Sequence, residues 1–386
     1  SCYEVMSGWP MVSLPHGATS AKKDLQKQIP FLQGYQEIVL FFDNDEAGRQ
    51  AVESASGILP AGRVKIARLD AYKDASDALQ AGDADAVRKA IWDAKPYTPD
   101  GIVEGKDLLE LVTQPTKDYD HLYPFDGLNK MVQGIRYGEL TTLTAGTGSG
   151  KSSLVRALAV DLLKKGEKVG YLALEESNKR SALGLMSNAR GKAYHIGEHG
   201  QEELTDAFND TIANWNLYLF DGFGSFDPDV IYNRIEYLAS GLECRIIFLD
   251  HLSILLSGLD GDERRMIDTT MTRLRSLVER TGITLFLVSH LRRSSSDSNS
   301  HEEGGRVSLG QLRGSHSISQ ISDSVIAMER DQQSEDANNI TTLRVLKNRY
   351  SGSTGVATRL TYDLSSCQFY ETKNDEQPEF DPTEDF

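Results

Sequence analysis

The chain has 386 residues, a hydrophobic content of 39% and a formal net charge of −16 at neutral pH. This length accommodates two or three domains, and the apolar content is sufficient for at least one large core. The negative charge argues against a protein that coats nucleic acid with its whole surface, so any DNA-binding site must be a local basic one.

The cysteines and the hydropathy of the chain indicate which cellular compartment to expect. Cys2, Cys244 and Cys367 are far apart and match neither a disulfide framework nor a zinc-ligand spacing. We therefore expect a reducing cytoplasm and no zinc. No apolar run approaches the roughly 18 residues of a membrane span, and no signal peptide is visible, so no membrane partner is expected.

Residues 1–95 are predicted to form a small α/β domain. Asp43 and Asp45 directly follow one of its apolar runs, and carboxylates at the end of a strand are suitable ligands for Mg²⁺. A solvated turn followed by a helix cap would produce the same pattern. The strands of this domain are expected at 11–14, 37–42 and 64–69.

Residues 96–124 are predicted to form a linker, because four prolines interrupt them. Residues 102–112 remain as one short amphipathic helix. A helix of this length is marginal by itself, so we expect it to dock on another surface, such as that of a neighbouring subunit.

The stretch 140–153 has the pattern of a phosphate-binding loop. It begins as an apolar run, has glycine at three of five positions, and ends in Lys-Ser before a helical pattern. Glycines let the backbone N–H groups turn towards an anion, the lysine reaches the β- and γ-phosphates, and the serine hydroxyl holds Mg²⁺. The strict pattern has glycine where this chain has Ala145. The expected nucleotide contacts here are Ala145, Gly146, Thr147, Gly148, Ser149, Gly150, Lys151, Ser152 and Ser153.

Residues 125–371 alternate strand and helix patterns, which predicts a mainly parallel sheet with helices on both faces. The expected parallel strands are 138–145, 169–174, 217–220, 245–249 and 283–288. Four further strands then follow one another directly, which predicts an antiparallel extension. These strands are expected at 324–328, 342–346, 356–361 and 368–371.

Three polar residues lie at the ends of the predicted parallel strands. Asp250 is placed where P-loop ATPases orient the water shell of Mg²⁺. Glu175 is suited to orient the attacking water, although an acidic residue also favours the first turn of the following helix. His290 is suited to contact the γ-phosphate, although a lone histidine is as often structural.

A polar, serine-rich loop at 291–306 carries several arginines on an otherwise acidic chain. Such a loop can hold a phosphate backbone, while the alternative is a plain solvated loop. The candidate DNA-binding residues are Arg292, Arg293, His301, Arg306, Arg313 and Gly314.

In combination, these motifs resemble the bifunctional primase-helicases of podophages, close to the mitochondrial helicase Twinkle and the DnaB class. The resemblance covers nearly the whole chain. It rests on Leu174-Glu175-Glu176-Ser177, Leu249-Asp250-His251, Asp262 to Asp268, Ser289-His290-Leu291, His301 to Gly304, Leu312 to Ser315, and Leu346-Lys347-Asn348-Arg349 with Gly352, Thr354 and Gly355.

The resemblance implies an α/β fold with a RecA-like P-loop NTPase core in residues 125–371. It further implies a homohexameric ring, with a heptamer left open, that surrounds single-stranded DNA, moves 5′ to 3′ and unwinds duplex DNA. Hydrolysis of ATP or dTTP with Mg²⁺ would drive this movement in the cytoplasm of a phage's host.

The resemblance also assigns roles to individual residues. Glu175 corresponds to the catalytic base, His290 to the residue that couples γ-phosphate to DNA, and Arg349 to an arginine finger that reaches a neighbouring subunit's site. Gln320 corresponds to a companion sensor. Arg330 and Tyr362 correspond to residues that pack the base, and Lys347 belongs to the nucleotide-binding set. The DNA loop is richer in serine than in phage relatives, and Ser319 replaces a basic residue.

The first domain resembles the later part of a Toprim domain, so Asp43 and Asp45 form a candidate remnant metal site. The glutamate that completes such a site would precede Ser1. We therefore expect a structural role and no primer synthesis by this chain alone.

Residues 372–386 are expected to be a disordered acidic tail. One interpretation is a docking peptide for the replicative DNA polymerase, with Phe386 as an anchor, and the other is a solubilising tail. For the motor itself, the alternative to a closed helicase ring is a RecA-like DNA-dependent ATPase that forms open strand-exchange filaments without unwinding.

Overall fold

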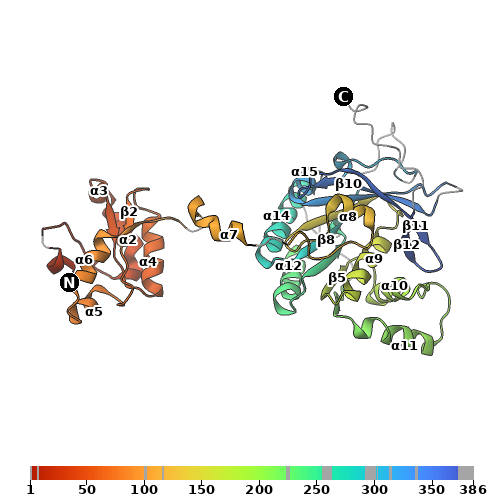
Figure 1. The fold of residues 1–386 in the computed structure, drawn as a ribbon, viewed down its shortest axis with the longest axis horizontal. Coiled ribbons are helices and arrows are strands. Elements are labelled where there is room, and N and C mark those ends of the chain that lie inside the picture. Colours follow the sequence, from red (N-terminus) through yellow and green to blue (C-terminus); the bar gives the residue numbers. More distant parts are fainter. Residues whose placement is uncertain are drawn as a thin grey trace, which may run out of the picture. The chain divides into compact units, whose positions relative to one another are not determined.

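The computed structural model describes residues 2–6, 8–99, 102–114, 117–222, 227–253, 263–291, 301, 303–312, 315–334 and 338–372. The chain divides into two compact units, residues 1–115 and 116–386, and each is described by itself (Figure 1). Among the described residues, no helix is both long enough and apolar enough to cross a membrane.

The first unit contains a three-stranded sheet in the order β1-β2-β3, in which β1 and β2 are parallel and β3 is antiparallel to β2. The strands are β1 (Ile38–Leu40), β2 (Val64–Ile66) and β3 (Lys95–Pro96). The helices are α1 (Cys2–Val5), η1 (Ala18–Ser20), α2 (Ala21–Lys27), α3 (Ile29–Leu32), α4 (Glu46–Ser56), α5 (Ala75–Gln80), α6 (Ala84–Trp92), η2 (Gly105–Leu108) and α7 (Leu109–Thr113).

The predicted strand at 11–14 is wrong, because these residues have no regular secondary structure. Val12 is 76% exposed, although Leu14 packs against the core of this unit. A strand requires a hydrogen-bonding neighbour, and an apolar run alone does not guarantee one. The predicted helix at 102–112 begins as the 3₁₀ turn η2 and continues as α7, with Leu109 and Leu111 both exposed.

The second unit contains a nine-stranded sheet in the order β12-β11-β10-β9-β4-β8-β7-β5-β6. Its strands are β4 (Leu140–Ala145), β5 (Val169–Ala173), β6 (Leu217–Leu219), β7 (Ile246–Asp250), β8 (Thr284–His290), β9 (Ser324–Glu329), β10 (Ile340–Asn348), β11 (Gly355–Asp363) and β12 (Gln368–Glu371).

The six strands from β9 to β6 are parallel, and β10 to β12 extend the sheet in antiparallel fashion. The mainly parallel sheet and its extension are therefore confirmed. β9, which was predicted within the antiparallel part, joins the two parts, because it pairs antiparallel with β10 and in parallel with β4. A strand's direction depends on its partner, which its own residues do not specify.

Two hydrophobic clusters cover the two faces of this sheet. Neighbouring residues of β7 alternate between them, since Phe248 belongs to one cluster and Leu249 to the other. Helices α8 and α9 contribute to the first cluster, and α12, α14 and α15 to the second. The helices are α8 (Asp126–Val132), α9 (Lys151–Lys164), α10 (Asn178–Arg190), α11 (Gln201–Asn209), η3 (Ile212–Asn214), α12 (Pro228–Glu236), the π-helix η4 (Tyr237–Gly241), α14 (Glu263–Thr281), η5 (Leu309–Gln311) and α15 (Ser315–Ile321).

Candidate nucleotide-binding site

The loop between β4 and α9 has a backbone that depends on its glycines. Gly148 and Gly150 have φ angles of 73° and 91°. Residues that carry a Cβ atom rarely adopt such angles. A Cβ atom on Gly146 would lie 2.9 Å from the Cβ of His301. The Ser149 hydroxyl donates to the Gly146 carbonyl at 2.9 Å and closes the turn. The loop thus precedes the N-terminus of a long helix, where backbone N–H groups attract anions.

Lys151 is the first residue of α9 and is 9% exposed. Its Nζ donates to the carbonyls of Ala145 at 3.2 Å and Gly146 at 2.8 Å, so the ammonium group lies inside the loop. Burial lowers the pKa of Lys151, while the charges of Asp250 and Glu175 act in the opposite direction. A bound phosphate would replace the two carbonyls as a stronger, charge-assisted partner.

Ser152 and Asp250 bring two oxygen ligands together although they are 98 positions apart. The Ser152 hydroxyl donates to Asp250 Oδ2 at 3.0 Å. Asp250 ends β7 and is 8% exposed, and burial raises the pKa of its carboxyl while the Ser152 hydroxyl partly opposes the rise. A hydroxyl and a carboxylate beside the phosphate loop are the hard oxygen donors that Mg²⁺ prefers, so these residues fit that ion.

The strand order β8-β7-β5 places His251 between His290 and Glu175. His251 Nε2 and Glu175 Oε1 are 2.5 Å apart, and the rings of His251 and His290 meet edge to face with centroids 4.0 Å apart. The backbone N–H of Ser253 donates to His251 Nδ1, so Nε2 carries the proton that His251 donates to Glu175. Glu175, His251 and His290 offer ligand atoms within 4.8 Å of one another.

Glu175 and Glu176 differ sharply in their surroundings. The Glu175 side chain is 56% exposed, whereas Glu176 receives hydrogen bonds from Arg156 Nη2 at 2.6 Å and Ser181 Oγ at 2.8 Å. Glu176 therefore joins α9 to α10. This arrangement favours Glu175 over Glu176 as the residue that meets a water molecule.

The sequence motifs contained His251 without indicating a role of its own. It directly follows Asp250, which marks it as a residue at a strand end. Its position between Glu175 and His290 depends on the strand order, which the local sequence does not contain. Gln332 was also missed, although its Nε2 donates to the Thr147 carbonyl of the phosphate loop at 2.7 Å.

Arg330 and Tyr362 lie near the phosphate loop. A Cβ on Gly150 would be 4.0 Å from Arg330 Nη1, and Arg330 follows the last residue of β9. Burial raises the pKa of Tyr362, and a hydrogen bond with Ser153 in the first turn of α9 opposes that rise. The structure therefore brings both predicted base-packing residues to the same side of the sheet as the loop.

Lys347, Arg349 and Gln320 form a separate group. Lys347 Nζ donates to the carbonyls of Ser319 at 2.6 Å and Gln320 at 2.9 Å. Arg349 Nη2 donates to the same Gln320 carbonyl at 3.0 Å. Burial, together with the nearby Arg349 charge, lowers the pKa of Lys347.

This second group lies at the opposite end of the parallel strands from the phosphate loop. Asn348 pairs with Ser324, and Ser324 pairs with Thr141 near the start of β4, whereas the loop follows the end of β4. Five residue steps of a strand separate the two positions by roughly 17 Å. Arg349 is therefore too far away to reach the phosphate loop of its own subunit.

Of the candidate DNA-binding residues, Arg292, Arg293, Arg313 and Gly314 lie outside the described residues. Arg306 is exposed. His301 is 8% exposed and packs against Gly146, and neither of its ring nitrogens has a hydrogen-bond partner within the described part of the chain. His301 thus lies beside the phosphate loop, although it belongs to the segment 291–306 that was predicted to face DNA.

In the first unit, Asp45 is the N-cap of α4. Its side chain accepts a hydrogen bond from the Gly48 N–H at 2.9 Å, which lowers the pKa of the Asp45 carboxyl. A Cβ on Gly48 would lie 1.9 Å from the Asp43 carbonyl oxygen, so only glycine fits there. The Asp-x-Asp-Glu-Ala-Gly segment is accounted for by this tight turn into a helix, and the metal site at Asp43 and Asp45 stays a prediction.

Comparisons with known proteins agree with this geometry. The sequence profile of a family described as "DnaB-like helicase C terminal domain" matches residues 123–371, and a profile described as "Toprim-like" matches residues 11–79. The chain is 37% identical over 369 residues to the DNA helicase/primase of Enterobacteria phage T3, covering 92% of this chain and 64% of that protein.

More distant relatives include a probable plasmid replicative DNA helicase of Chlamydia muridarum, 25% identical over 239 residues, with 60% of this chain and 50% of that protein covered. The chain thus spans less than two thirds of the length of both curated relatives. Among solved structures, one ATPase domain is similar with a TM-score of 0.58 at 20% identity, covering 71% of this chain and all of that one. A DnaB-like replicative helicase studied with primase has a TM-score of 0.57 at 19% identity, covering 76% of this chain and 71% of that one. These likenesses support the RecA-like fold.

Proposed function

This chain belongs to the DnaB-like helicase family, and from that premise we propose that it is the motor of a replicative DNA helicase driven by nucleoside triphosphate hydrolysis. The observation that supports this best is the placement of Arg349 and the phosphate loop at opposite ends of the same strands. Hydrolysis then requires a neighbouring copy of the chain, and closed repetition of that contact produces a ring. We propose six subunits, with seven as the alternative.

Within one site, the chain's own residues carry most of the chemistry. The phosphate loop and Lys151 bind the β- and γ-phosphates, and Ser152 and Asp250 would hold Mg²⁺, which would neutralise phosphate charge. Glu175 orients the attacking water. His251 donates a hydrogen bond to Glu175, and its ring contacts that of His290. Arg349 of a neighbouring subunit stabilises the charge that develops in the transition state. Arg330 and Tyr362 pack the base of ATP or dTTP.

The proposed substrate is a single DNA strand in the centre of the ring, along which the ring moves 5′ to 3′. The loop that follows His290 is proposed to hold its phosphates, because it carries arginines on an otherwise acidic chain. The acidic tail is proposed to contact the replicative DNA polymerase, and the three free thiols agree with a reducing host cytoplasm. The first unit is proposed to be structural, without primer synthesis of its own.

The test is nucleoside triphosphate hydrolysis with and without single-stranded DNA on size-separated protein, with Lys151→Ala as the inactive control. We expect turnover to rise strongly with DNA and to occur in a fraction of about six subunits. Strand displacement with a 5′ or a 3′ tail then gives the polarity. Open filaments that hydrolyse without unwinding would favour the RecA-like strand-exchange alternative, and DNA-independent turnover by a monomer would contradict both.

A further inference from the structure

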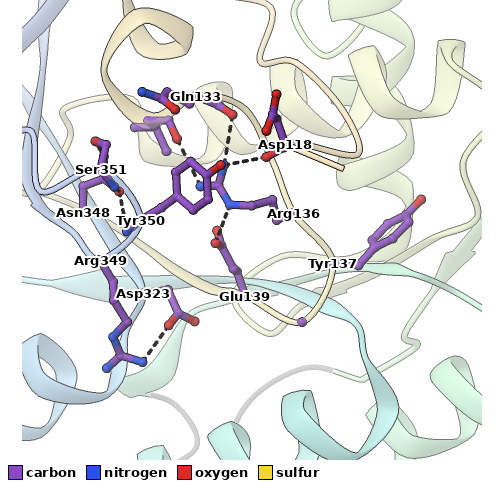
Figure 2. Close-up of polar contacts among 12 residues, drawn as sticks. Asp118, Gln133, Arg136, Tyr137, Glu139, Asp323, Asn348, Arg349, Tyr350 and Ser351 are labelled. Atoms are coloured by element: carbon purple, nitrogen blue, oxygen red, sulfur yellow. Dashed lines mark hydrogen bonds and ion pairs between the residues drawn. The ribbon is translucent and has the colours of Figure 1, made fainter. Parts of the chain in front are cut away.

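One buried carboxylate holds the arginine finger inside its own subunit. Asp323 Oδ1 accepts a hydrogen bond from Arg349 Nη1 at 2.8 Å, as Figure 2 shows. The backbone N–H of Arg349 also donates to the Asp323 carbonyl at 2.8 Å. The Asp323 side chain is 7% exposed, whereas that of Arg349 is 52% exposed. The guanidinium therefore has one face on a fixed anchor and another open to a partner.

Asp323 does not depend on Arg349 for its neutralisation. Its other oxygen, Oδ2, accepts hydrogen bonds from Arg275 Nη1 at 2.6 Å and from the backbone N–H of Leu140 at 2.9 Å. If Arg349 turns towards a phosphate, Asp323 remains paired, so no buried charge is left alone. The finger can therefore exchange partners without the large cost that a lone buried ion pair would impose.

The turn that carries the finger is also fixed. Asn348 Nδ2 donates to the Met131 carbonyl at 2.9 Å, and Asn348 Oδ1 accepts the backbone N–H of Tyr350 at 3.1 Å. The buried guanidinium of Arg136 lies 3.8 Å from the centre of the Tyr350 ring (Figure 2). These contacts hold the backbone on both sides of Arg349, so the remaining freedom is in its side chain.

Asp323 connects this turn to the strand that leads to the phosphate loop. Asp323 and Leu140 exchange two hydrogen bonds, because the Asp323 N–H also donates to the Leu140 carbonyl at 2.8 Å. Leu140 begins β4, and the phosphate loop follows the end of β4. The finger offered to a neighbour is thus tied, through one side chain, to the strand that carries the subunit's own nucleotide loop.

We propose that Asp323 is the positioning residue of the arginine finger, which it orients towards the neighbouring subunit and links to β4 of its own subunit. This inference rests on the proposed ring-shaped motor. It assigns Asp323 no contact with nucleotide. Its loss should therefore lower turnover at the neighbour's site while the subunit's own nucleotide affinity stays the same.

The first experiment uses Asp323→Asn, which retains an oxygen acceptor for Leu140 but removes the charge that attracts both arginines. We expect DNA-stimulated kcat to fall between about tenfold and a hundredfold, since a misplaced group costs that much without changing binding. The nucleotide dissociation constant and ring size should stay at wild-type values. In an Arg349→Ala background the same change should have no further effect.

Glu279→Gln is the matched control, because Glu279 accepts a hydrogen bond from Arg275 Nη2 at 2.8 Å and, among the described residues, is not paired with Arg349. This variant should hydrolyse like the wild type. If Asp323→Asn does not assemble, Asp323→Glu keeps the charge for Arg275 while displacing the carboxylate, and we expect the same loss of kcat. Wild-type kcat in whichever Asp323 variant assembles would overturn the inference.

Rings that contain two different variants distinguish a positioning role of Asp323 from general misfolding of the Asp323 variant. Lys151→Ala subunits lack an active site but retain a good finger, whereas Asp323→Asn subunits retain their own site and lack a well-placed finger. A mixture should hydrolyse faster than the sum of the two proteins measured alone, as should a mixture of Lys151→Ala with Arg349→Ala. Recovery in the second mixture without recovery in the first would overturn the role of Asp323 alone. Wild-type rings that ignore DNA would instead remove the proposed function.

Discussion

Asp45 and Asp250 follow apolar strands in the two units, and they meet opposite surroundings. Asp45 accepts the Gly48 N–H at the start of α4, and this hydrogen bond lowers its pKa. Asp250 is buried beside Ser152, and burial raises its pKa. The same local pattern therefore gives a helix cap in one unit and a candidate ion ligand in the other. The elements packed around the strand end decide between them.

The largest effect is expected for Asp250→Asn. Removing the charge should lower Mg²⁺-dependent hydrolysis by about a thousandfold or more, because metal stabilisation of phosphate charge contributes several kcal/mol. Steady-state hydrolysis at saturating Mg²⁺ measures it, and a chelator added to the wild type should reproduce the loss. Near-normal turnover would contradict a role for Asp250 in holding Mg²⁺.

An intermediate effect is expected for His251→Phe, which keeps an aromatic ring beside His290 but removes the N–H that His251 donates to Glu175. We expect kcat to fall between about tenfold and a hundredfold, while nucleotide affinity is retained. His251→Gln offers an N–H donor and should recover part of the rate. Equal kcat for the Phe variant and the wild type would contradict a positioning role for His251.

The smallest effect is expected for the double change Asp43→Asn and Asp45→Asn, which should leave DNA-stimulated hydrolysis unchanged. Because an Asn side chain caps a helix about as well as Asp, the protection of the Gly48 amide and the melting temperature should also stay close to their wild-type values. Loss of hydrolysis in this variant would show that the first unit takes part in the motor.

The contact between Asp45 and the Gly48 N–H predicts that the stability of the start of α4 depends on pH. Because the folded-state pKa of Asp45 is lowered, its contribution is present above the ordinary carboxyl pKa and is lost as the pH falls through the lowered value. Protection of the Gly48 amide should therefore decline on acidification in the wild type. In the Asn variant this decline should be absent.

Sequence patterns predicted the second unit more accurately than the first. The runs at 169–174 and 245–249 became β5 and β7, because strands buried on both faces are continuous apolar segments bounded by polar residues. The shorter run at 11–14 is also mostly apolar, yet it forms no strand. Whether a short run pairs depends on a neighbour elsewhere in the chain, so its own composition is insufficient.

The sequence by itself determined the phosphate loop, because three glycines, Lys151 and Ser152 act within one turn and one helix start. For Asp45 the sequence left two interpretations open, a helix cap that spans four residues and a metal ligand. Only the tertiary structure decided that His251 lies between Glu175 and His290, and that Asp323 joins Arg349 to β4. It also decided that Arg349, the proposed arginine finger, and the phosphate loop lie at opposite ends of the strands. The physical reason is that local conformation follows from neighbouring residues, whereas strand order and buried ion pairs join residues from distant parts of the chain.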